Sequence, residues 1–160
     1  AKMNKQRDEI LGILLPDQDY SFLLPNVSIA EIFTLESNLI TTSDVHSSNT
    51  VKSTIQWRGK DIILFHLNYF SAEHYQVQDI FNFTKARIAV INSITKPAQP
   101  SYAILATDTP KLTRLTSQGL HDCEETSYDA IAYKGRLGQD IVHIPDLMYL
   151  ETLAARYLNA

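Results

Sequence analysis

The 160-residue chain is poor in cysteine and glycine, and neither residue occurs in a pattern of reactive chemistry. The single cysteine, Cys123, permits no internal disulfide, which is typical of a protein from a reducing cytoplasm. The five glycines form no phosphate-binding loop and no nucleophile elbow. No apolar run approaches the ~18 to 20 residues that span a bilayer, so we expect no direct membrane insertion.

Basic residues are also too few and too scattered for a nucleic-acid surface. Fourteen Lys and Arg stand against eighteen Asp and Glu, which gives a net charge of −4. A small barrel that binds nucleic acid should show a basic stripe with aromatics, so this class is disfavoured. Residues 1–9 are polar, lack the apolar core of a signal peptide and are expected to form a flexible tail.

The histidines and the cysteine do not form a recognisable metal or nucleophilic site. None of the five histidines lies at zinc-site spacing. The best metal candidate, His121-Asp122-Cys123-Glu124, is not followed by a second ligand pair and reads more simply as a polar loop. Cys123 would need a base to act as a nucleophile, and the sequence identifies none. We therefore expect no cofactor and no bound metal.

A short unit occurs twice, half a chain apart. Gly59-x-Asp61-Ile62 recurs as Gly138-x-Asp140-Ile141, and the shift is 79 residues for both glycine and aspartate. Repetition on this scale indicates two comparable lobes. His66 and His143 follow the two copies, so a facing acid–base pair in a cleft between the lobes, and hence an enzyme, is one alternative. The other is that each is a half-buried strand histidine.

Short runs rich in Ile, Val, Phe and Tyr predict a mainly β protein. Apolar residues recur with a period of 3.6 only after Asp146, a suitable N-cap, which predicts a helix to Leu158. Residues 41–50 and 116–129 are polar and are expected to be surface loops, while Ser71–Phe83 fits either a helix or a crossover. The expected strands are Ile10–Leu15, Tyr20–Leu24, Val27–Phe33, Ser53–Trp57, Lys60–Leu67, Arg87–Ser93, Tyr102–Thr107, Leu112–Leu115, Ala130–Tyr133 and Gln139–Ile144.

Trp57 and Arg58 are the best candidates for a binding surface, because they precede Gly59 at a probable hairpin turn. Trp offers a rigid apolar face and Arg a fork of five donors, and both are enriched at binding hot spots. The structural alternative is a Trp that closes the end of a barrel beside a salt-bridged Arg. The two interpretations are compatible.

Nearly the whole chain from Ile10 resembles the CheW-like family, the small adaptors of bacterial chemosensory arrays. The family's Asn-aliphatic-Arg-Gly turn, with its following apolar-Pro-apolar-Asp-Leu run, resembles residues 56–67. Arg58, Gly59 and Leu67 match this signature, whereas Gln56, Ile63 and His66 replace its Asn, Pro and Asp. Residues 22–32 are similar to the leucine-proline and Val-x-Glu-Ile stretch, Tyr102–Asp108 to a second-lobe strand, and Gly138–Leu150 to the closing strand and helix. These departures, with Ser53 at a usual glycine, resemble the divergent branch that serves type IV pili and twitching motility.

The resemblance implies two SH3-like five-stranded barrel lobes with a C-terminal helix, in one domain over residues 10–160. One lobe would span roughly 10–70 plus returning C-terminal elements and the other 87–145, with the division between Leu67 and Arg87. It also implies a non-catalytic cytoplasmic adaptor, recruited to membrane-associated arrays, that couples a chemoreceptor tip to the regulatory domain of a CheA-type histidine kinase. Ile29 and Glu31 would face the receptor groove, beside Arg58 and Gly59, and we add Trp57 to this partner-binding set.

Overall fold

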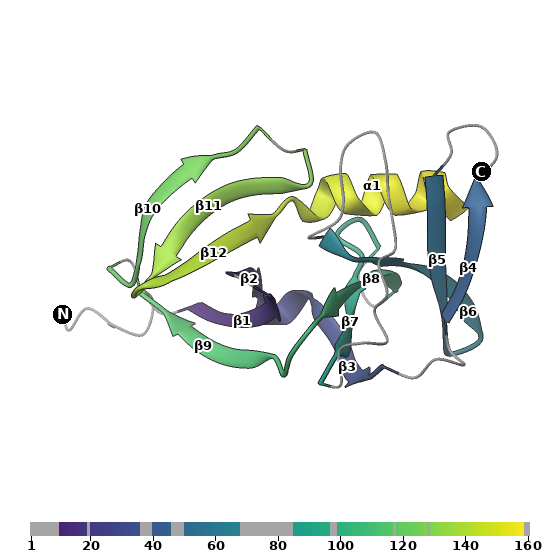
Figure 1. The fold of residues 1–160 in the computed structure, drawn as a ribbon, viewed down its shortest axis with the longest axis horizontal. Helices are drawn as coiled ribbons and strands as arrows, with labels where there is room; N and C mark the ends of the chain where they lie inside the picture. The colour runs from purple at the N-terminus through teal and green to yellow at the C-terminus, as the bar shows by residue number, and fades with distance from the viewer. Residues whose placement is uncertain are drawn as a thin grey trace.

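A computed structural model describes residues 10–18, 20–35, 40–45, 50–67, 85–96, 99–116, 118–127 and 129–158. These residues form β-strands, a short 3-10 turn and one helix (Figure 1). In chain order the elements are β1 (Ile10–Asp17), β2 (Tyr20–Pro25), η2 (Asn26–Ser28), β3 (Ile29–Thr34), β4 (Ile40–Val45), β5 (Thr50–Trp57), β6 (Lys60–Phe65), β7 (Arg87–Asn92), β8 (Pro100–Ala106), β9 (Lys111–Leu115), β10 (Leu120–Glu125), β11 (Ile131–Leu137), β12 (Asp140–Pro145) and α1 (Leu147–Leu158).

The strands form two sheets, and the mainly β, two-lobed architecture predicted from the sequence is confirmed. Lobe 1 has the strand order β10-β11-β12-β2-β1-β9, and lobe 2 has the order β3-β7-β8-β6-β5-β4. Each sheet therefore has six strands, one more than the five expected. In both lobes the two edge strands follow each other in the chain, so each sheet curls until its edges approach, as in an SH3-like barrel.

Each half of the chain contributes to both lobes. The hairpin β1–β2 belongs to lobe 1 and is followed by β3–β6 of lobe 2, whereas the hairpin β7–β8 belongs to lobe 2 and is followed by β9–β12 of lobe 1. We predicted that the lobes divide between Leu67 and Arg87. In the structure, lobe 1 instead takes strands from both sides of that segment. The chain passes between the sheets at η2 and again after β8.

The two halves correspond through a shift of 80 residues. The hairpin pair Trp57↔Lys60 corresponds to Leu137↔Asp140, and the parallel β6–β8 contact at Ile63 corresponds to the β12–β2 contact at His143. The repeated glycine unit thus marks equivalent hairpins, although its own shift is 79. The reason is that Gly59 is the second residue of its two-residue turn, and Gly138 is the first.

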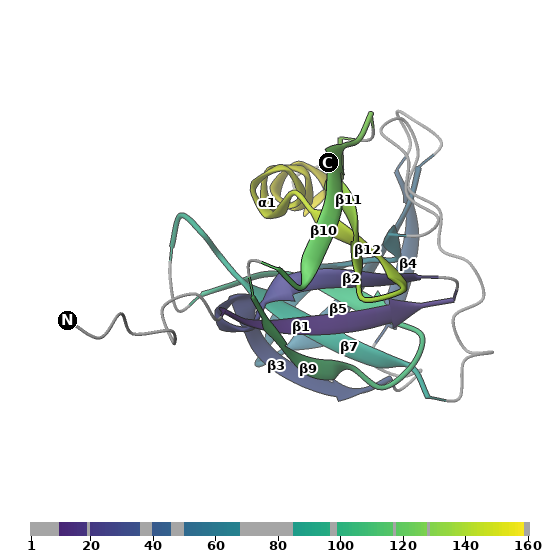
Figure 2. The same ribbon diagram turned by 90° about the vertical axis from the view of Figure 1, so that its left-hand side faces the viewer.

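The main core lies between the lobes. Figure 2 shows β1 and β2 of lobe 1 lying across strands of lobe 2. Apolar side chains from both sheets and from α1 form one buried cluster there, which includes Leu15, Phe22, Phe65, Tyr102 and Leu150. The opposite faces of β6, β7 and β8 line a second cluster inside lobe 2. Strands at the seam are therefore buried on both faces, as Ile62–Leu67 and Tyr102–Ala106 are.

The predicted C-terminal helix is confirmed. The Asp146 carboxylate accepts a hydrogen bond from the Tyr149 amide at 3.0 Å, which caps α1 as expected. The helix leaves lobe 1 and packs against β6 and β8 of lobe 2. Its buried residues are Leu150, Leu153 and Ala154, on one face.

Two segments expected to be loops contain strands. Residues 41–45 form most of β4, which pairs along its length with β5, and residues 120–125 form β10. Both are edge strands, which backbone pairing with one neighbour can hold without an apolar alternation in the sequence. All of β10 after Leu120 is exposed, as expected of a surface segment. Ser71–Phe83 and residues 1–9 lie outside the described residues.

One buried position of lobe 1 carries glycine where lobe 2 carries a large side chain. The 80-residue shift relates Gly135 on β11 to Ile55 on β5, which is fully buried in the lobe 2 core. A Cβ added to Gly135 would lie 2.9 Å from Cys123 Sγ and 3.2 Å from the His121 carbonyl oxygen, both on β10. The absence of a side chain at this position lets β10 pack directly on β11.

We predict that Gly135→Ala destabilises the protein by about 1–3 kcal/mol, because the added methyl must push back sulfur and backbone of β10. Chemical denaturation of the purified chain measures the change. Cys123→Ala is nearly neutral alone and restores part of the loss in the double variant, because it removes the closest atom. Equal losses with and without Cys123→Ala would contradict the contact as the cause.

Candidate partner-binding site

Four of the five predicted binding residues lie together at one end of lobe 2. The Trp57 indole Nε1 donates a hydrogen bond to Glu31 Oε2 at 2.7 Å, and the Arg58 guanidinium lies over the Trp57 ring, 4.4 Å from its centroid. Trp57 is on β5 and Glu31 on β3, which three other strands separate in the sheet order. The hydrogen bond therefore joins distant strands across the curled sheet.

The β5–β6 turn fixes the position of Arg58. Arg58 and Gly59 form a two-residue turn between Trp57 and Lys60, and both have positive φ, 48° and 79°. This is the geometry of a type I′ turn, whose twist matches that of the paired strands. Arg58 occupies a backbone region that costs a residue with a Cβ about 1–2 kcal/mol. Its cation–π contact with Trp57 offsets part of that cost.

Trp57 combines the two roles considered from the sequence. It is half-buried and packs against the core cluster of lobe 2, so it does close this end of the barrel. Its indole N–H and the stacked Arg58 nevertheless face an exposed rim with Glu31. The rim offers a rigid aromatic face, a cation and a carboxylate within a few ångströms, which is a suitable chemistry for anchoring a protein partner.

Ile29, the fifth predicted residue, lies at the lobe junction and packs partly against the main core. Beside it is a pocket of about 390 Å³, lined among others by Pro25, Val27, Ile94 and Leu147. Val27 is 85% exposed and Ile94 49% exposed, which is unusual for large apolar side chains. Sequence reasoning missed both, because Val27 was predicted to begin the strand Val27–Phe33 and Ile94 lies one residue beyond the predicted strand Arg87–Ser93.

The two histidines of the enzyme alternative have different partners. His66 is buried and its Nε2 lies 3.4 Å from Asp17 Oδ1. His143 is half-buried and stacks on Tyr20, with ring centroids 3.9 Å apart. Neither histidine lines the junction pocket. The two rings therefore contact opposite members of the Asp17↔Tyr20 pair of the β1–β2 hairpin.

The candidate metal-binding segment behaves as a polar strand. His121 contacts the neighbouring Asp122 carboxylate and the Gly138 carbonyl oxygen, each at 3.2 Å, and Cys123 is exposed. Among the described residues no three His, Cys, Asp or Glu side chains are grouped so that they could hold a metal ion. The same part of the chain contains no helix long and apolar enough to cross a bilayer.

Comparison with known proteins gives a result at the level of fold. No family model matches the sequence, and no curated protein matches it. Among solved structures, the scaffolding protein TtCheW from Thermoanaerobacter tengcongensis is similar, with a TM-score of 0.58 and 10% sequence identity. The match covers 86% of this chain and 89% of that one. The chain therefore has a CheW-like fold, as the resemblance of its motifs implied.

His143 generates a prediction about pH. Burial, and then the charge of Lys134, lower the pKa of His143 below its ordinary value, so the folded protein holds this ring neutral. The unfolded chain binds the proton first as pH falls through about 6.5, so stability decreases below that pH until the folded-state pKa is reached. In urea unfolding at several pH values, we expect His143→Phe, which keeps the stack on Tyr20, to lose less stability than the wild type between about pH 7.5 and 5.5. The same replacement of exposed His121 is the control, and identical pH profiles for all three proteins would contradict the prediction.

Proposed function

We propose that the chain is a non-catalytic adaptor that couples a chemoreceptor's cytoplasmic tip to the regulatory domain of a CheA-type histidine kinase. The observation that carries the proposal is the CheW-like fold shared with a solved scaffolding protein along almost the whole of both chains. Fold alone does not define function, so the proposal also depends on the chemistry of the surface.

The proposed receptor surface runs along β3. It begins at the junction pocket with Val27, continues past Ile29 and ends at the rim formed by Glu31, Trp57 and Arg58. Ile29 pairs with Ile91 of the main core and Glu31 with Val90 of the lobe 2 cluster, so their side chains point to opposite faces of β3 and the proposed surface wraps around this edge strand. An apolar floor with a charged rim suits the amphipathic helices of a receptor hairpin.

The proposed kinase surface uses the sheet edges. The edge strands β3, β4, β9 and β10 each have one side not paired within their sheet. Such edges and their apolar surroundings can bind the strand of a similar barrel. An adaptor with two lobes can present one edge from each, which allows it to bridge two partners.

The finer assignment rests on the sequence resemblance. Replacement of the family's Asn, Pro and Asp by Gln56, Ile63 and His66 supports a divergent system that controls type IV pili and twitching. The absence of any internal disulfide supports a cytoplasmic location. Recruitment to membrane-associated arrays would then follow from receptor binding.

We predict that Arg58→Glu weakens binding of a receptor-tip fragment by about 1–3 kcal/mol, because it reverses a charge on the rim. Ile29→Asp should weaken binding as well, by placing a charge on the apolar floor. Calorimetric titration of the fragment against each purified variant measures the effect. Arg58→Asn is the matched variant, since Asn tolerates positive φ and removes the charge without reversing it, and we expect a smaller loss.

Thermal melting is the control for folding. An exposed turn charge contributes little to stability, so the melting temperature of Arg58→Glu should stay close to that of the wild type. Unchanged affinity in both Arg58→Glu and Ile29→Asp, with folding intact, would place the receptor surface elsewhere. Binding to the isolated kinase regulatory domain, measured with the same variants, tests the adaptor role separately from this surface.

A further inference from the structure

The seam between the lobes carries polar contacts at both ends. Strand β8 runs along the seam for seven residues, or roughly 23 Å. The loop that leads into β8 contacts Glu151 of α1, and Thr107, directly after β8, contacts the end of β1. Each end includes one acidic side chain, the partly exposed Glu151 at one and the buried Asp17 at the other, and the two differ in how well their oxygens are hydrogen-bonded.

Glu151 is fully engaged. Its carboxylate accepts hydrogen bonds from the Ile94 amide at 2.7 Å and from the hydroxyls of Thr95 and Ser93 at 2.7 and 3.0 Å. Burial raises the pKa of Glu151, but the hydrogen bonds from Thr95, Ile94 and Ser93 outweigh burial and hold the pKa below its ordinary value. Several short hydrogen bonds to the Glu151 carboxylate hold α1 against the loop that precedes β8 at this end of the seam.

Asp17 at the other end is poorly satisfied. Its side chain is 0% exposed, and its Oδ1 lies 3.4 Å from His66 Nε2, longer than the 2.7–2.9 Å usual for a charge-assisted bond. Its second oxygen, Oδ2, is buried without a hydrogen-bond partner among the described residues. A buried carboxylate with unmet acceptors gains free energy when water reaches it.

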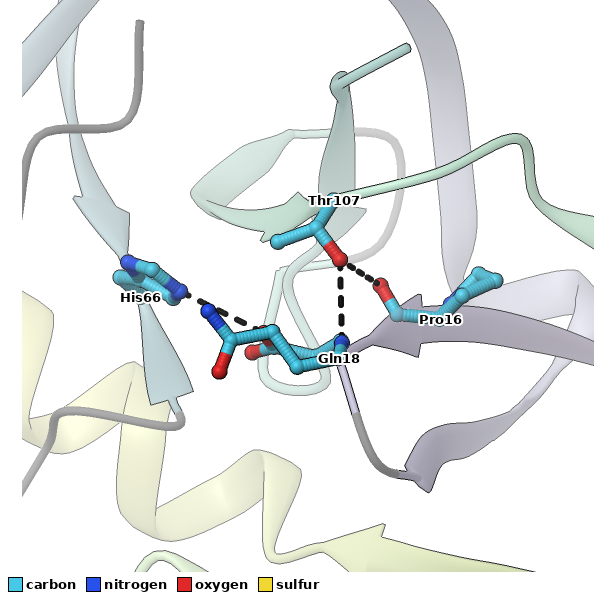
Figure 3. Close-up of polar contacts among 5 residues, drawn as sticks. Pro16, Gln18, His66 and Thr107 are labelled. Atoms are coloured by element: carbon cyan, nitrogen blue, oxygen red, sulfur yellow. Dashed lines mark hydrogen bonds and ion pairs between the residues drawn. The ribbon is translucent and has the colours of Figure 1, made fainter. Parts of the chain in front are cut away.

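Hydrogen bonds between β1 and Thr107 also join the lobes at this end. The Thr107 amide donates to the Pro16 carbonyl at 2.8 Å. Thr107 Oγ1 accepts from the Gln18 amide at 3.1 Å (Figure 3). The Thr107 hydroxyl also lies 3.3 Å from the Pro16 carbonyl oxygen. These bonds join β1 of lobe 1 to β8 of lobe 2. They would break together if Asp17 and His66 moved apart.

We propose that the Asp17–His66 contact is a releasable latch, and that the lobes pivot about the Glu151 end and open at the Asp17 end. Opening hydrates the Asp17 carboxylate, which offsets part of the cost of exposing the apolar surface nearby. The junction pocket, which contains Ile94, lies at the pivot end. The latch therefore changes the angle between the lobes while the pocket stays intact.

Native-state amide exchange tests the latch, because local opening exposes the amides of Thr107 and Gln18 before those of β8. In His66→Ala we expect exchange at these two amides to rise tenfold or more, with Ala103 in the middle of β8 unchanged. Adding Asp17→Asn to His66→Ala removes the charge that favours opening and should return the exchange of Thr107 toward the wild-type rate. A uniform rise at Thr107 and Ala103, or no rise at all, would overturn the proposal.

Asp17→Asn alone keeps the test decisive if His66→Ala fails to fold. A latch held by the Asp17–His66 contact requires Thr107 to exchange faster in this variant, with Ala103 unchanged, because the contact is weakened. Exchange of Thr107 at or below the wild-type rate would overturn the proposal. Glu151→Gln is the control at the other end, where it should raise exchange at Ile94 and leave Thr107 unchanged.

Discussion

Burial of the same strands on both faces is the constraint on which the rest of the structure depends. Phe22, Leu23 and Leu24 are all buried, and so are the consecutive residues of Ile62–Leu67 and Tyr102–Ala106. These strands carry the two parallel contacts, β2 with β12 and β6 with β8. One face of each strand must therefore pack inside a barrel, and the other face must pack at the seam between the lobes. The lobes, the helix and the junction pocket are all positioned by that shared layer.

The sequence predicted the central strands and the helix well because their signals are local. Proline and glycine punctuate β1, β2 and β6, and the change to a period of 3.6 after Asp146 is specific for a helix. The polar edge strands were missed. Thr41–Val45 and His121–Glu125 offer no apolar alternation, and only pairing with β5 and β11 makes them strands. Interleaving of the halves was also missed, because long-range pairing leaves no trace in local periodicity.

The site residues also differ in whether a local sequence signal predicts them. Arg58-Gly59 was found because a primed turn demands a glycine or a tolerant residue, and Trp57 followed from its place beside that turn. Glu31 came from resemblance, and its hydrogen bond to Trp57 was not foreseeable at a separation of 26 residues. Asp17 was not among the predicted site residues. Its burial against His66, 49 residues away, depends on how the seam closes and has no signature in the sequence.

The exchange of hairpins between the halves has a consequence for how such a chain can arise. Each half, taken alone, is a hairpin followed by four strands that belong to the opposite sheet. Two separate copies of such a unit would complete each other only as a strand-swapped homodimer with twofold symmetry. Joining the copies end to end converts that dimer into a monomer with the same contacts. It also frees the two equivalent surfaces to diverge, so that one fold can present two different faces.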